Sequence, residues 1–287
     1  MRLIHLTDPH LTSLHSTPWR SLRGKRISGY LSWRNKRQYR HLPDVLKRVT
    51  EAVLAEQPDR ILLTGDLMHI GLESEAAEAA AWLRSIAPPE RLLLVPGNHD
   101  IYAPDSAGWL AHYWQDYLPA GGFPCRQDLG DIRIVGLNSA VVTPLFSARG
   151  ALDSGQLSRL PAALDRNRLN ILLIHHPPLP GLTGWRKALR EADELAVRFR
   201  EAAPDLALYG HIHYNRSDDY KGVRLFCTAS ASGQRMASYR VFDISGAPGQ
   251  WKVSMQLKTL RHDVDNGGKF RVDEQLDWEV RRGTVAA

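Results

Sequence analysis

The fold of this chain is decided at Leu92-Leu93-Leu94-Val95-Pro96-Gly97-Asn98-His99-Asp100. The four apolar residues predict a buried strand, and Pro96-Gly97 predicts the turn that ends it. Asn98, His99 and Asp100 follow the turn, so the strand delivers three polar side chains to the carboxyl edge of a sheet. Open α/β sheets bind their ligands at that edge. The stretch therefore predicts both a buried strand and a functional site at its end.

The same pattern, an apolar strand followed by residue types that bind metals, occurs at four other places in the chain. These are Leu3–Leu6 before Asp8 and His10, Ile61–Leu63 before Gly65 and Asp66, Ile171–Ile174 before His175 and His176, and Leu206–Tyr209 before Gly210, His211 and His213. Five strands that end in this chemistry predict a single ligand site assembled at the ends of strands.

Length and composition are those of a globular protein. The chain has 287 residues, of which 43% are hydrophobic, and it shows no linker and no internal repeat. We therefore expect one domain over residues 1–287. Two cysteines, Cys125 and Cys227, are typical of a reduced, cytoplasmic protein. No signal peptide is expected, because the first strand starts at about Arg2, and no apolar run approaches the roughly 18 residues of a membrane span.

Positive charge is concentrated in one segment. The chain has a net charge of +6, yet no Asp or Glu occurs between Pro9 and Pro43, and the remainder of the chain is mildly acidic. The segment carries eight cations, which are Arg20, Arg23, Lys25, Arg26, Arg34, Lys36, Arg37 and Arg40. We call residues 15–41 the basic insertion.

The basic insertion also contains aromatic residues, including Trp19 and Trp33, and its glycines Gly24 and Gly29 predict a loop with one or two short helical turns. Three interpretations remain open. The segment is a solvated basic face, an interfacial segment that binds anionic lipid, or a lid whose cations bind a phosphate-bearing substrate. We favour the last two together. No nucleic acid partner is expected, because one basic stretch on an acidic body is a small electrostatic footprint.

Further elements follow from periodicity. We expect helices over residues 44–56 with Asp44 as N-cap, 73–86, 109–118, 154–168 and 186–201. We also expect strands over residues 131–137, and over 223–228, 238–244 and 251–260 in a second sheet. His69 is interpreted as a surface histidine or one that lies behind the ligands. The tail beyond Asp263 is polar and carries no recognisable motif.

The side chains at the strand ends have the chemistry of a metal centre. They comprise two carboxylates, one amide oxygen and four imidazoles, from Asp8, His10, Asp66, Asn98, His175, His211 and His213. This mixture suits Mn, Fe, Zn or Co, whereas calcium takes oxygen ligands only. Seven ligands are too many for one ion, but with one shared carboxylate they form two sites that keep open positions. Two ions about 3.5–4 Å apart can clamp a phosphoryl group.

The ordered set D-x-H, G-D, G-N-H-D, H-H-P and G-H-x-H resembles the calcineurin-like metallophosphoesterase superfamily. The resemblance covers about residues 1–230. It implies an α/β fold, a four-layer α/β/β/α sandwich of two mixed sheets with helices on the outer faces. It also implies hydrolysis of a phosphoester by water.

The resemblance also implies a role for each motif residue. Asp8, His10 and His213 hold one ion, Asn98, His175 and His211 hold the other, and Asp66 bridges the two. His175 is chosen over His176 because the family ligand aligns with the first histidine. His99 is the non-ligand histidine that acts on the substrate, and Asp100 is expected to orient it by a hydrogen bond. The cofactors are two divalent ions, with manganese as the first choice and iron, zinc or cobalt as alternatives.

The function that follows is hydrolysis of a phosphodiester or pyrophosphate by metal-activated hydroxide. The basic insertion favours an amphiphilic nucleotide-linked lipid such as UDP-diacylglucosamine, bound at the inner face of the membrane by a peripheral cytoplasmic enzyme. An alternative is a cyclic-nucleotide or glycerophosphodiester phosphodiesterase, because Gly150-Ala151-Leu152 and Gln156-Leu157 resemble that bacterial branch. The second alternative is a non-catalytic scaffold with the same fold.

Overall fold

A computed structural model describes residues 1–11, 13–261 and 268–282, and two six-stranded sheets lie within these ranges. The first sheet has the strand order β12-β11-β10-β1-β2-β3. Its strands are β1 (Arg2–Leu6), β2 (Arg60–Leu63), β3 (Leu92–Leu94), β10 (Ala237–Ala247), β11 (Gln250–Arg261) and β12 (Lys269–Arg281). The second sheet has the order β4-β5-β6-β7-β9-β8. Its strands are β4 (Cys125–Leu129), β5 (Ile132–Gly136), β6 (Leu169–Leu173), β7 (Leu206–Tyr209), β8 (Arg216–Tyr220) and β9 (Val223–Cys227).

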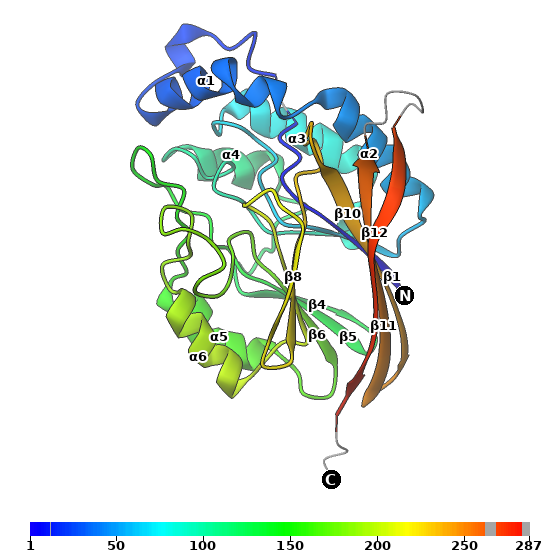
Figure 1. The fold of residues 1–287 in the computed structure, drawn as a ribbon. Helices are drawn as coiled ribbons and strands as arrows, with labels where there is room; N and C mark the ends of the chain where they lie inside the picture. Colours follow the sequence, from blue (N-terminus) through cyan, green and yellow to red (C-terminus); the bar gives the residue numbers. More distant parts are fainter. Residues whose placement is uncertain (12, 262–267, 283–287) are drawn as a thin grey trace.

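Helices cover the outer face of each sheet, and this confirms the expected four-layer sandwich (Figure 1). The α-helices are α1 (Lys25–Asn35), α2 (Pro43–Ala55), α3 (Glu73–Ile86), α4 (Ser106–Tyr113), α5 (Ser154–Ala163) and α6 (Ala192–Glu201). Short 3-10 turns are η1 (Trp19–Ser21), η2 (Arg37–Tyr39) and η3 (Pro89–Arg91). Helices α2, α3 and α4 pack on the first sheet, and α5 and α6 pack on the second.

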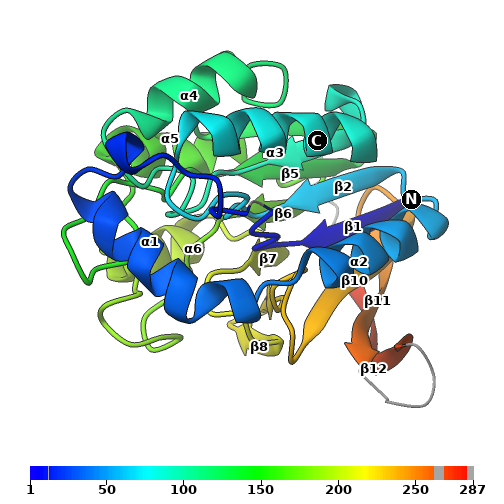
Figure 2. The same cartoon turned by 90° about the horizontal axis from the view of Figure 1, so that it is seen from above.

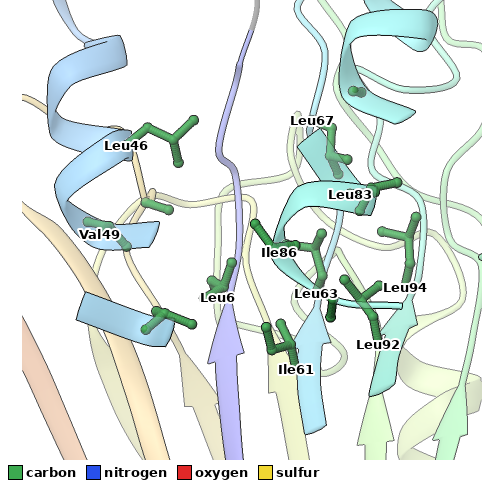
Figure 3. Packing of buried hydrophobic residues seen from close by; sticks show 14 of the residues in the cluster. Leu6, Leu46, Val49, Ile61, Leu63, Leu67, Leu83, Ile86, Leu92 and Leu94 are labelled. Atoms are coloured by element: carbon green, nitrogen blue, oxygen red, sulfur yellow. The ribbon is translucent and has the colours of Figure 1, made fainter. Parts of the chain in front are cut away.

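Alternation along the strands divides the core into layers. In β2, Ile61 and Leu63 pack against the helices, whereas Leu62 packs between the two sheets. Figure 3 shows Leu63 beside Ile86 of α3, with Ile61 next along β2 in the helix-facing layer. Because successive side chains of a strand point to opposite faces, a run that is apolar throughout belongs to a strand buried on both sides. This is why the motif-bearing strands read as continuous apolar segments.

The motif strands run in parallel and end together. β1 pairs in parallel with β2, and β2 with β3, while β6 and β7 form a parallel pair in the other sheet. Figure 2 shows the arrowheads of β1 and β2 pointing toward the side on which α1 lies. The five predicted strands are therefore confirmed to within two residues, and their carboxyl ends lie at one edge of the sandwich.

The expected grouping of the late strands in one second sheet is wrong. β9 belongs to the second sheet, but β10 pairs antiparallel with β1 and extends the first sheet with β11. The tail also contains β12, which the sequence analysis missed. Most of its side chains face solvent, so its composition is polar, and only one side, including Trp278, packs on the core. The parts of that tail at 263–267 and 283–287 lie outside the described residues.

The basic insertion is more ordered than a loop, because α1 is a helix of eleven residues. Gly29 lies inside this helix without breaking it. A Cβ at this position would collide with the side chains of Tyr102 and Ile70. Close packing, and not a turn, therefore explains this glycine. The N-cap of α2 is Leu42, and Asp44 lies in the first turn behind Pro43. No helix among the described residues is long and apolar enough to cross a bilayer.

Candidate active site

Seven predicted side chains meet where the motif strands end. The first of two groups lies around Asp8. Nε2 of His213 lies 3.1 Å from Oδ1 of Asp8, although β7 and β1 belong to different sheets. Nε2 of His10 lies 3.9 Å from Oδ2 of Asp66. One ligand atom each from Asp8, His10, Asp66 and His213 lies within 4.8 Å of the others. These four residues can hold one cation.

A second group shares the Asp66 carboxylate. Nε2 of His175 lies 3.4 Å from Oδ2 of Asp66 and 3.2 Å from Oδ1 of Asn98. The ring centroid of His211 lies 5.0 Å from that of His175. Asp66 therefore lies between two sets of ligand atoms, the position that a bridging carboxylate requires.

The backbone at this centre adopts an uncommon conformation. Asp8, His10, Asp66, His211 and His213 all have positive φ angles, between 41° and 71°. Non-glycine residues avoid this region, and where they occupy it the surrounding structure enforces the strain, commonly at functional sites. Five of the seven predicted ligands are thus held in a conformation that their own side chains disfavour.

Glycines leave room for the carboxylates. A Cβ at Gly97 would overlap the side chain of Asp66, and a Cβ at Gly210 would overlap Thr7 and Asp8. Oδ2 of Asp8 accepts hydrogen bonds from the hydroxyl of Thr7 at 2.7 Å and from the N–H of His211 at 3.0 Å. The Gly-Asn and Gly-His motifs therefore need glycine because the backbone touches a carboxylate. Gly65 of the Gly-Asp motif instead has a positive φ angle of 78° and touches the backbone of Gly97.

The imidazoles are oriented as metal ligands are. Nδ1 of His10 lies 2.8 Å from the carbonyl oxygen of Met68, and Nδ1 of His175 lies 2.6 Å from that of Thr64. A ring whose Nδ1–H donates to a carbonyl presents an unprotonated Nε2, the form that binds metal. Nε2 of His10 and of His211 are buried without a hydrogen-bond partner in the described part of the chain. Such polar atoms need a partner, so the residues fit divalent cations.

The charges of the site favour cations as well. Burial lowers the pKa of His175, but the Asp66 and Asp8 carboxylates outweigh it and raise the pKa to about 9. At nearby His41, burial dominates instead and lowers the pKa to about 3, so this ring is neutral. Carboxylates that attract a proton to His175 attract a divalent ion equally, and the two compete for the same atom.

His99 lies beside the ligands, as the resemblance implied. Its backbone N–H donates to Oδ1 of Asp66 at 2.7 Å, and its ring Nδ1 lies 2.6 Å from the carbonyl oxygen of His69. The expected hydrogen bond from Asp100 to His99 is wrong for the described residues. The Asp100 carboxylate accepts four backbone N–H groups instead, those of Gly97, Asp66, Leu67 and Met68, at 2.8–3.1 Å. Asp100 therefore shapes the loops that carry the ligands.

Two further histidines, His69 and His176, are buried beside the ligands. The ring of His69 stacks on His10 at a centroid distance of 5.0 Å. Of the two interpretations of this residue, the position behind the ligands agrees with the structure and the surface position is wrong. His176 is buried behind His175. Its Nδ1 lies 2.8 Å from the hydroxyl oxygen of Ser139, and a Cβ at Gly150 would collide with the ring.

Two residues of the basic insertion belong to the site and were missed. The ring of His41 lies 4.2 Å from that of His10 and 5.2 Å from that of His213 between centroids. Nη1 of Arg37 lies 3.0 Å from Nδ1 of His99. Neither residue stands in a spacing motif, so only the absence of acidic residues from the segment pointed toward a role with anions.

Solved structures agree with the fold. A purple acid phosphatase, PPD1 from yellow lupin, superposes with a TM-score of 0.61 at 14% identity, over 99% of this chain and 54% of that chain. At this identity the likeness concerns the fold alone.

Sequence relatives are named as phosphodiesterases. The 3',5'-cyclic adenosine monophosphate phosphodiesterase CpdA of Escherichia coli K12 is 29% identical over 243 residues, or 82% of this chain and 77% of the relative. The glycerophosphodiester phosphodiesterase GpdQ of Enterobacter lignolyticus is 31% identical over 134 residues, or 44% of this chain and 45% of the relative. A family model described as calcineurin-like phosphoesterase matches residues 1–215. Because this match spans most of the chain and includes every motif block, the chain belongs to the calcineurin-like phosphoesterase family of metal-dependent phosphoester hydrolases.

Proposed function

We propose that this protein is a phosphodiesterase with two divalent metal ions. Asp8, His10 and His213 would hold one ion, Asn98, His175 and His211 would hold the other, and the Asp66 carboxylate would be shared between them. The observation that carries the proposal is the position of the Asp66 carboxylate, 3.9 Å from Nε2 of His10 and 3.4 Å from Nε2 of His175. Manganese is the first choice, with iron, zinc and cobalt as alternatives, because the donors mix nitrogen and oxygen.

The ions, when bound, supply Lewis acidity and an activated water for attack on phosphorus. The protein supplies geometry. Asp66 and Asn98 fix the spacing of the two sites, and the carbonyl groups of Met68 and Thr64 hold the rings of His10 and His175. Because Nδ1 of His99 faces the carbonyl of His69, Nε2 of the neutral ring carries no proton. Nε2 can therefore take up a proton from water and pass it to the leaving oxygen. A poor leaving group, such as the alkoxide of a diester, needs that proton.

A small phosphodiester is the substrate that the observations favour. The two sequence relatives described above are named for a cyclic nucleotide and for glycerophosphodiesters. The cyclic-nucleotide enzyme matches over most of both chains. Most of the ligands are almost fully buried, and His213, whose side chain is 34% exposed, lies at the open side of the centre. A centre of this kind suits a compact diester.

A membrane-bound substrate such as UDP-diacylglucosamine is the second candidate, and one observation favours it. Trp19, Ile27 and Leu31 are 46–70% exposed on the outer side of the basic insertion. The same segment carries five exposed cations, namely Arg20, Arg23, Arg34, Lys36 and Arg40. Against this candidate, Trp33 and Arg26 are buried and face the protein. Five of the eight cations remain for an anionic lipid surface.

A substrate panel tests the function. The protein, loaded with manganese, is assayed on cyclic nucleotides, glycerophosphodiesters, aryl phosphate monoesters and nucleotide-linked lipids. We expect the highest kcat/KM on a small diester. Turnover of the nucleotide-linked lipid alone would favour the second candidate. No turnover of any member with any divalent ion would favour the non-catalytic scaffold.

Sedimentation with vesicles tests the membrane candidate separately. The probes are phosphatidylcholine vesicles with and without phosphatidylglycerol. If the insertion binds lipid, replacing the five exposed cations by glutamine abolishes sedimentation with the anionic vesicles. Equal sedimentation of the variant and the parent protein would exclude that role.

A further inference from the structure

Arg37, from the basic insertion, is a cation beside the catalytic histidine. Its Nη1 lies 3.0 Å from Nδ1 and 3.4 Å from Nε2 of His99. The residue begins η2, the 3-10 turn that directly follows α1. The guanidinium is therefore part of the site, although it lies in none of the motif blocks.

The contacts of Arg37 position its charge without neutralising it. Nη2 donates to the carbonyl oxygen of Gly29 at 2.8 Å, and Nη1 donates to that of His69 at 3.3 Å. Nε is buried and has no hydrogen-bond partner among the described residues. Within the same residues, no carboxylate lies within 4 Å of the guanidinium. Arg37 is partly buried, and the Glu75 and Asp66 carboxylates act on its charge only from a distance. The guanidinium can therefore still take a direct anionic partner.

The segment that carries Arg37 is fixed to the protein from both sides. The guanidinium of Arg26 forms hydrogen bonds of 2.9 and 2.7 Å to the carboxylate of Asp105. Nζ of Lys25 donates to the hydroxyl oxygen of Thr143 at 2.7 Å, on the loop between β5 and α5. Trp33 is buried in the cluster that includes Tyr102. Arg37 is thus held in place by the fold.

We propose that Arg37 binds the phosphoryl group of the substrate. Its guanidinium takes a non-bridging oxygen of the phosphodiester on the His99 side of the centre, so that the anion has a cationic partner there in addition to the two ions. Arginine suits this role because its planar array of N–H donors matches two phosphoryl oxygens. The inference rests on the proposed function, because it requires that phosphate binds beside His99.

Inorganic phosphate is the probe, and titration calorimetry of the metal-loaded protein is the measurement. In Arg37→Met, which keeps the length of the side chain but removes its charge, we expect phosphate to bind about 10- to 100-fold more weakly. The KM for a diester substrate rises by a similar factor. Arg34→Met is the matched control, since Arg34 is exposed near the end of α1, and it should bind phosphate as the parent protein does. Metal content is measured on each protein by elemental analysis.

Arg37→Lys resolves the case in which Arg37→Met loses metal. It keeps the charge but not the planar array of donors, so it should retain both ions and bind phosphate more weakly than the parent protein. Unchanged phosphate affinity in a fully loaded Arg37 variant overturns the proposal. Loss of metal from both variants also overturns it, because Arg37 would then support the ions. Phosphate binding that depends on Arg37, without hydrolysis of any diester, would support the phosphate contact and refute the proposed function.

Discussion

Nε2 of His175 lies 3.4 Å from Oδ2 of Asp66, and the two residues follow strands of different sheets, β6 and β2. Asp8 and His213 make the same kind of contact, at 3.1 Å, between β1 and β7. Both contacts cross the interface between the sheets. The centre therefore depends on how the two sheets pack.

Asp66→Ala should leave less than one metal ion per chain after dialysis against a metal-free buffer. The bridging carboxylate is the one ligand that both proposed sites share, so its loss weakens both. Elemental analysis of the dialysed protein gives the stoichiometry, and Asp116→Ala, at an exposed position, is the control. Two tightly bound ions in Asp66→Ala would contradict the bridging role.

His99→Ala should keep its metal and lose about 10²- to 10⁴-fold in kcat on a diester, because its Nε2 is the proposed proton donor. The loss should be smaller for a diester with an activated aryl leaving group, which needs no proton. His112→Ala, exposed on α4, provides the comparison. Equal losses on activated and unactivated substrates would exclude proton transfer by His99.

Asp100→Ala should lower the free energy of unfolding by roughly 3 kcal/mol or more, since four buried N–H groups lose their acceptor. Urea denaturation measures the change. Asp153→Ala, which removes the N-cap of α5, should cost about 1 kcal/mol and sets the scale. A change at Asp100 no larger than that at Asp153 would mean that these four bonds contribute little.

Glu274→Ala should destabilise the protein by roughly 2 kcal/mol, less than a fully buried pair because Glu274 is partly exposed. Its Oε2 lies 3.0 Å from Nη1 of Arg240, a fully buried cation on β10. Glu279, also on β12, forms an exposed ion pair with nearby Arg281, and Glu279→Ala should change the stability little. Equal effects of the two substitutions would remove the buried pair as the cause.

Lys25 should react with amine-acylating reagents at lower pH than an ordinary lysine. Burial, and then the charge of Arg37, lower its pKa to about 8, so the amine is neutral above that pH. Mass spectrometry of acylated protein should give a midpoint near pH 8. The same peptide labelled in urea should titrate near 10.4. Coinciding midpoints would show that Lys25 is not buried as described.

Local sequence determined the five motif strands and the side chains that follow them. A buried parallel strand must be apolar on both faces, and the Gly-containing turns must leave space for carboxylates, so both features are written in consecutive residues. The number of candidate ligands predicted two sites, whereas the assignment of each ligand to a site and the role of His99 came from resemblance to the family. These assignments remain proposals. The register of the late strands was not local, because β10 pairs with β1 across most of the chain.

Tertiary structure alone decided where the basic insertion places its side chains. Its composition predicted positive charge near an anion but did not separate the cations that face inward, Arg26 and Arg37, from those that face solvent. The positions of His41 beside His10 and of Arg37 beside His99 depend on packing against residues distant in the chain, such as Tyr102. Contacts of this kind have no period and no fixed spacing, because they arise only when separate surfaces meet in the folded protein.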